Sequence, residues 1–177
     1  MKRLLFLILV LSSLNCFSQI NRTIWGLTLG SSTKMEVRSK LIQKDFKVYI
    51  DNDGSVFSAG QSIFFGGVEW AMVSFNFVDG ILSEIIFSDP GVDSSGQRNN
   101  EKYDILKRNL NSKYMNNYNK EKSVYMHDNQ THSPFIVDYY TDKRSSIDLT
   151  IHGSMLMIRY IDNYLNKKVQ MKGVDEL

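Results

Sequence analysis

The sequence has one cysteine, two prolines and little net charge, and each scarcity excludes a class of protein. Because Cys16 has no second cysteine to pair with, no disulfide framework holds the chain, and its stability must come from a packed core. A formal charge of only +2, without a long basic run, argues against nucleic-acid binding. With only two prolines and with aromatic residues at 12%, the composition is not that of a disordered tail.

Residues 1–18 have the pattern of a secretory signal peptide. Lys2 and Arg3 precede an apolar run that is shorter than the about 20 residues needed to span a bilayer. Cleavage at the end of this segment removes both basic residues and lowers the formal charge from +2 to 0. We therefore predict an exported protein, periplasmic or secreted, with no transmembrane helix in the mature chain. Lipid attachment at Cys16 is the alternative.

The next segment, residues 19–89, predicts a helix followed by strands. Thr33 and Glu36 have the spacing of a capping box, so the helix begins there and runs to about Lys44. Its inner stripe comprises Val37 and Leu41, with Met35 and the stem of Lys44 as further candidates.

Beyond the helix the hydrophobic period changes to two, which is typical of strands. The predicted strands are residues 46–50, 55–58, 62–65, 68–78 and 81–88. Asp79-Gly80 between two apolar runs is a strong hairpin signal, because both turn residues must accept positive φ. On this hairpin Val73, Phe75 and Phe77 should face the same side as Ile81, Ile85 and Phe87. Asp51-Asn52-Asp53-Gly54 reads as a turn, since a calcium loop would need Gly at position six and Glu at position twelve.

A polar stretch rich in Gly and Ser, residues 89–100, separates this half from a second one with the same order of elements. A helix at 101–115 places Tyr103, Leu106, Leu110 and Tyr114 at helical spacing. Strands follow at 123–127, 135–141, 147–152 and 155–162, and residues 163–177 form a polar tail without a clear period. We predict a single α+β domain over 19–162, with two helices packed on one face of a mainly antiparallel sheet. The halves 19–89 and 98–162 suggest, without proving, an internal duplication.

The chain has no complete catalytic motif. His127, Asp128 and His132 lie in one polar loop and could bind a metal, although their spacing matches no standard zinc site. The acids on predicted strands could form a carboxylate pair, but alternation favours the solvated face of the sheet for them. These are Glu69, Glu84, Asp138 and Asp148. No cofactor motif is present, and we predict no cofactor.

Aromatic side chains exceed the needs of a minimal core. Some of them could form an exposed patch for a partner, since Trp and Tyr are favoured at interfaces, although core positions are the commoner use. The candidate binding residues are Trp25, Trp70, Tyr139 and Tyr160.

The stretch Trp25-Gly26-Leu27-Thr28-Leu29-Gly30-Ser31-Ser32-Thr33-Lys34-Met35-Glu36-Val37 resembles the opening of small bacterial envelope domains. These include the outer-membrane assembly lipoproteins and the β-lactamase-inhibitor-like domains, and the leader is similar to those of small secreted Bacteroidetes proteins of unknown function. The resemblance implies helices on an antiparallel sheet and a protein-binding role, with no catalytic residues to transfer.

Taken together, these patterns favour a binding domain without catalysis, whose partner is a protein or another envelope ligand. One alternative is an extracytoplasmic metal-dependent hydrolase that uses the His127 loop. The other is an inhibitor or an immunity-type protein.

Overall fold

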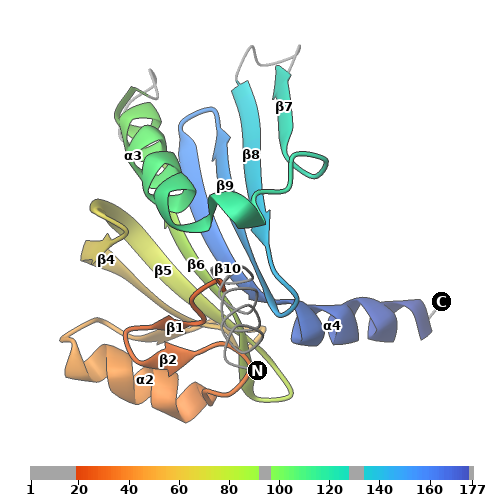
Figure 1. Ribbon diagram of the computed structural model, residues 1–177. Coiled ribbons are helices and arrows are strands. Elements are labelled where there is room, and N and C mark those ends of the chain that lie inside the picture. The colour runs from red at the N-terminus through yellow and green to blue at the C-terminus, as the bar shows by residue number, and fades with distance from the viewer. Residues whose placement is uncertain (1–18, 92–96, 128–133, 176–177) are drawn as a thin grey trace, which may run out of the picture.

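The computed structural model describes residues 19–91, 97–127 and 134–175. Three helices and ten strands, with one short 3-10 helix, make up the described chain (Figure 1). In chain order they are β1 (Thr23–Ile24), β2 (Leu27–Thr28), α2 (Lys34–Gln43), β3 (Tyr49–Ile50), β4 (Val56–Phe65), β5 (Val68–Val78), β6 (Ile81–Asp89), α3 (Gln97–Tyr114), η1 (Met115–Asn117), β7 (Val124–His127), β8 (Pro134–Thr141), β9 (Ser145–His152), β10 (Met155–Asp162) and α4 (Asn163–Asp175).

Eight of the strands form one antiparallel sheet in the order β3-β4-β5-β6-β10-β9-β8-β7. Each half of the chain contributes a four-stranded meander, and the last strands of the two meanders, β6 and β10, pair at the centre. The predicted α+β class with an antiparallel sheet is therefore confirmed. The Asp79-Gly80 turn also forms where predicted, between β5 and β6, with φ of 51° and 80°.

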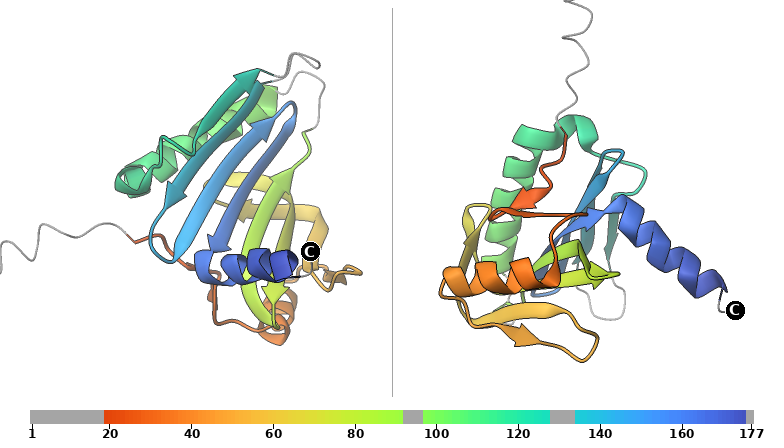
Figure 2. Two further views of the ribbon diagram at one scale, coloured as in Figure 1. Left: turned by 90° about the vertical axis from the view of Figure 1, so that its right-hand side faces the viewer. Right: turned by 90° about the horizontal axis from the view of Figure 1, so that it is seen from below.

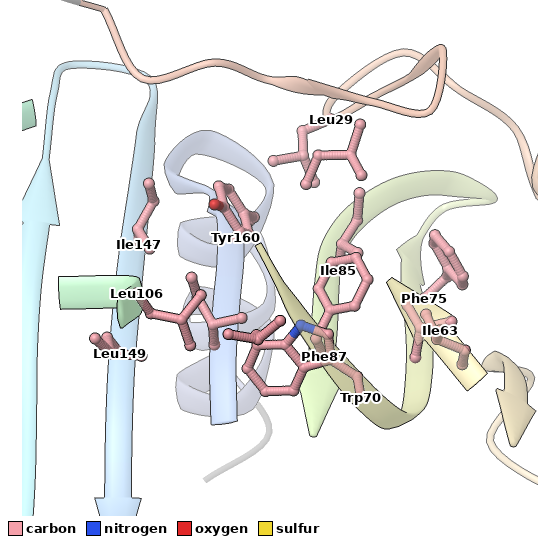
Figure 3. Packing of buried hydrophobic residues seen from close by; sticks show 14 of the residues in the cluster. Leu29, Ile63, Trp70, Phe75, Ile85, Phe87, Leu106, Ile147, Leu149 and Tyr160 are labelled. Carbon is pink, nitrogen blue, oxygen red and sulfur yellow. The ribbon is translucent and has the colours of Figure 1, made fainter. Parts of the chain in front are cut away.

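One face of the sheet carries the hydrophobic core. Strand register aligns Val73, Phe87, Ile158 and Leu149 in one row across four strands, and Phe75, Ile85, Tyr160 and Ile147 in the next. Figure 3 shows Phe87, Ile85, Tyr160 and Leu149 from these rows together with Trp70 from β5 and Leu106 from α3, all of them in one hydrophobic cluster. Burying such rows on one face leaves the alternate side chains of every strand on the other face.

Helix α2 has the capping box that its sequence predicts. The Glu36 N–H donates to the Thr33 hydroxyl at 3.3 Å, and the Thr33 N–H donates to the Glu36 carboxylate at 2.6 Å. Val37 and Leu41 are fully buried against the core, and α2 contacts β4. Met35, expected in the inner stripe, is instead 77% exposed. It lies two residues before Val37, about 200° around the helix, so it cannot share the face of Val37.

Other segments also differ from the predicted elements. The strand predicted over 46–50 is reduced to β3, and α3 begins at Gln97, within the predicted polar stretch. Residues 55–58 and 62–65 belong to one strand, β4, which a register shift between Ala59 and Ile63 bends without breaking. A second shift between Asn76 and Phe77 pairs Phe77 with Leu82, so Leu82 takes the buried position expected for Ile81. The tail predicted over 163–177 contains helix α4, which contacts β5 and β10.

Candidate interaction surface

The sheet face opposite the core is the surface that we consider as the functional site. We define the open face by two neighbouring cross-strand rows on β6, β10, β9 and β8. The register gives the first row as Ile86, Arg159, Asp148 and Tyr139, and the second as Ser88, Met157, Thr150 and Val137. In the left panel of Figure 2 these strands face the viewer, α3 lies behind them, and α4 crosses one end of the sheet.

Arg159 lies at the centre of the open face and is held by two carboxylates. Its Nε and Nη2 donate to one oxygen of Glu84, at 2.8 and 2.6 Å, and its Nη1 lies 3.7 Å from Asp148. The second Glu84 oxygen accepts from the Asn76 amide at 2.6 Å. The side chain of Arg159 is still 36% exposed, so the guanidinium is fixed in position while part of it remains accessible.

Asp148 is the least well compensated charge on the open face. Burial raises its pKa above the usual value, and the nearby Glu84 carboxylate raises it further, while Arg159 and Lys122 act in the opposite direction. Its Oδ1 atom is buried and accepts no hydrogen bond from any described residue. An unsatisfied buried acceptor costs stability, and such groups are concentrated at functional sites.

Tyr139 closes the first row of the open face and is half-buried. The ammonium of Lys122 lies 4.9 Å from the centroid of its ring, which is a cation–π distance. The open face thus combines an oriented arginine and a tyrosine with apolar neighbours, the residue types that carry most binding energy at protein interfaces.

The four acids expected on the solvated face lie at three different places in the structure. Glu84 and Asp148 are on the open face, where they bind Arg159. Asp138 lies in the core row opposite Leu149 and is 3% exposed. It accepts hydrogen bonds from the hydroxyls of Tyr103 and Tyr118 and pairs with Lys107, so it fastens α3 and the end of η1 to β8.

Glu69 belongs neither to the rows of the open face nor to the core row of Asp138. It lies on β5, its carboxylate accepts from the Ser62 hydroxyl on β4, and its backbone carbonyl accepts from Lys102. Lys102 in turn pairs with Asp89 in a buried ion pair at the N-terminal end of α3. These contacts tie the helix to the sheet, and we assign no chemistry to them.

The four aromatic candidates do not form one exposed patch. Trp70 and Tyr160 are 1% and 7% exposed and belong to the core. Trp25 is half-buried, with its ring edge-on to those of Phe46 and Phe87. Only Tyr139 reaches the open face.

The described residues include only one of the three metal candidates, His127. Asp128 and His132 lie outside the described residues, and of His127 only the backbone, in β7, is described. Among the residues that the structure does describe, no group of three or more His, Cys, Asp or Glu could hold a metal ion.

Arg159 is the residue that sequence reasoning missed. Leu156, Ile158 and Tyr160 alternate as buried residues along β10, so Arg159 between them had to point to the opposite face. What the sequence could not supply is the pairing of β10 with β6, which brings Glu84 within reach although it is 75 residues away.

Within the described ranges, no helix has both the length and the apolar character required to cross a membrane. In comparisons with known proteins, no family model, no curated protein and no solved structure matches the chain.

Proposed function

We propose that this chain is an exported, non-catalytic binding domain that holds a partner protein against its open face. The observation that carries the proposal is the Arg159 guanidinium, fixed by Glu84 and Asp148 within an otherwise apolar and hydroxyl-bearing surface. We also propose that the two similar halves, each a helix with a four-stranded meander, serve this purpose. Their helices cover one face of the sheet and leave the other for the partner.

An oriented arginine favours binding because less conformational entropy is lost when the partner docks. A free arginine side chain loses up to about 2 kcal/mol of rotamer freedom on being fixed, whereas Glu84 already restricts Arg159. Met157 on β10 and Tyr139 on β8, with β9 between them, provide further contact area on the same face. The Asp148 Oδ1 atom, which accepts no hydrogen bond from any described residue, favours a partner that brings a cationic or hydrogen-bond-donating group to this face.

Photo-crosslinking in the cells that make the protein tests the proposal. A photoreactive amino acid is placed at Met157 on the open face, and in a matched control at Arg38, which is exposed on α2. We expect one dominant crosslinked protein from position 157 that is absent from position 38 and is lost with Arg159→Ala. With that protein purified, Arg159→Ala should weaken binding at least tenfold and Arg38→Ala should leave it unchanged.

Three results would contradict the proposal. They are identical products from both positions, no product from position 157, and an affinity that Arg159→Ala does not change. A product of twice the chain mass would assign the open face to self-association instead. Inhibition of the captured protein's activity at one-to-one stoichiometry would identify the inhibitor or immunity-type alternative.

Export is the second part of the proposal, and the mass of the native chain tests it. Cleavage after residue 18 predicts an N-terminus at Gln19, and lipid attachment predicts an acylated Cys16. A chain that retains residues 1–18 inside the cell would contradict export. No described residue favours the metal-dependent hydrolase.

A further inference from the structure

A cavity of about 280 Å³ lies on the core side of the sheet, between α3 and the β1–β2 hairpin. It is separate from the open face and has no part in the function proposed above. Its walls come from four segments that are distant in sequence, and they are mostly apolar. The apolar side chains are Ile24, Trp25, Phe65, Leu106, Leu110 and Ile158.

Two tyrosine hydroxyls supply the polar end of this cavity. Tyr160, on β10, lines the cavity and is 7% exposed, yet its hydroxyl makes no hydrogen bond to any described residue. Tyr114, on the last turn of α3, is 3% exposed and accepts from the Asn21 N–H at 3.1 Å. Its own proton has no acceptor within the described part of the chain. Figure 3 shows the Tyr160 hydroxyl on the side of its ring away from Trp70.

Both hydroxyls can therefore donate a hydrogen bond to a ligand in the cavity, because no described residue accepts one from them. Burial raises the pKa of Tyr160, and the neighbouring Tyr114 raises it further. The phenol therefore keeps its proton at neutral pH and can donate it to an acceptor oxygen.

The cavity is polarised along α3. Leu106, Leu110 and Tyr114 are four residues apart, so the cavity wall that they form runs about 12 Å along the helix. The Leu106 end is apolar, and the Tyr114 end carries the hydroxyls. Lys113 also lines the cavity, and its ammonium lies 5.2 Å from the centroid of the Tyr114 ring, which places a positive charge at the polar end.

Trp25 forms the apolar wall at a conformational cost. It occupies the first position of the β1–β2 turn with φ of 55°, a region that bulky side chains rarely adopt. Contacts with the rings of Phe46 and Phe65, at centroid distances of 5.5 and 6.3 Å, hold it there. A strained residue that is held by its surroundings and lines a cavity is typical of a binding site.

We propose that this cavity binds a small monocarboxylate with an aromatic or short aliphatic body. The carboxylate accepts hydrogen bonds from Tyr160 and Tyr114 and is attracted by Lys113, and the body lies against Trp25 and Leu106. The cavity volume of about 280 Å³ is close to the lower end of the range of small-ligand pockets, about 300 Å³, which suits a ligand of this size.

Calorimetric titration of the full mature chain with 3-phenylpropionate and with octanoate tests the proposal. The neutral alcohols 3-phenylpropanol and octan-1-ol serve as matched probes. We expect both acids to bind more tightly than the alcohols, and Tyr160→Phe to weaken acid binding about tenfold, since it removes one hydrogen bond to a charged group. Lys113→Gln should reduce the preference for acids over alcohols about threefold.

The control for the phenol is Tyr140→Phe, because Tyr140 is a buried tyrosine whose hydroxyl bonds Asn111 away from the cavity. The control for the charge is Arg108→Gln, on the exposed side of α3. Leu110→Phe fills the cavity and should abolish binding in a chain that still melts cooperatively. The proposal is overturned if no probe binds at millimolar concentration, if alcohols bind as tightly as acids, or if Tyr160→Phe and Tyr140→Phe have equal effects.

Discussion

Asp138 offers the sharpest test of how the second half of the chain is held together. It lies on β8 in a row of core side chains, where a carboxylate is tolerated only because it is fully satisfied. One of its oxygens accepts from the Tyr103 hydroxyl and pairs with Lys107 at 2.9 Å, and the other accepts from the Tyr118 hydroxyl at 3.2 Å. Replacing it by alanine removes all three interactions at once.

The cost of Asp138→Ala follows from the groups that it leaves without a partner. Hydrogen bonds to a charged acceptor contribute about 1.5–3 kcal/mol each, and the buried Tyr103 hydroxyl then has no acceptor. The Lys107 pair adds little, because the lysine side chain is 38% exposed and therefore screened by solvent. We expect the free energy of unfolding to fall by about 3–5 kcal/mol, the range for breaking a buried polar network at one member.

Urea unfolding followed by circular dichroism measures this change. Asp104→Ala is the control, because Asp104 is an exposed carboxylate on α3, and it should change stability by less than about 0.5 kcal/mol. Tyr103→Phe separates the hydroxyl from the ion pair and should cost less than Asp138→Ala. A loss below about 1 kcal/mol for Asp138→Ala, with an unchanged urea dependence, would refute the reasoning.

Three further predictions concern pH and helix capping. Burial is the main cause that raises the pKa of Tyr103, Tyr140 and Tyr160 above 10.0. Above that pH the folded state therefore keeps protons that the unfolded chain loses. The contribution of these tyrosines to the free energy of unfolding should be fully present below pH 10. Above pH 10 the free energy of unfolding should fall by up to about 4 kcal/mol per pH unit, and urea midpoints between pH 8 and 11 measure this fall. The raised pKa of Asp148 implies stability that is present below its unfolded value of 3.8 and lost above it. Asp148→Asn should therefore raise the free energy of unfolding at pH 7 by about 1 kcal/mol, and a clear loss of stability would contradict this. Thr33→Ala should cost about 1 kcal/mol by removing the cap of α2, and no change in the thermal midpoint would contradict that.

The sequence predicts local elements well wherever the signal is contained in neighbouring residues. The strand 68–78, its Asp79-Gly80 turn and the capping box at Thr33 all form as expected. Each depends only on nearby residues: the strand on the alternation of apolar side chains, the turn on residues that accept positive φ, and the helix start on its N-cap. The missed features depend on context. The bulge in β4 keeps one strand where Gly60 suggested two, and α4 forms from a polar segment whose helical period is weak.

The candidate sites were less predictable because both depend on contacts across long stretches of sequence. Alternation along β10 alone predicts that Arg159 and Tyr160 point to opposite faces of the sheet, Arg159 to the open face and Tyr160 toward the core. It cannot say that Arg159 meets Glu84, which follows from the pairing of β6 with β10. Nor can it say that Tyr160 and Tyr114 line the same cavity, which follows from where α3 crosses the sheet.

The two proposals thus depend on consecutive residues of β10 that point to different sites. Arg159 points to the open face and Tyr160 into the cavity, so a substitution at one tests its own side of the sheet. If Arg159→Ala weakened carboxylate binding as much as Tyr160→Phe does, distortion of β10 would explain both effects, and neither site could be inferred from that variant. Independent effects of the two substitutions are therefore the result that both proposals require.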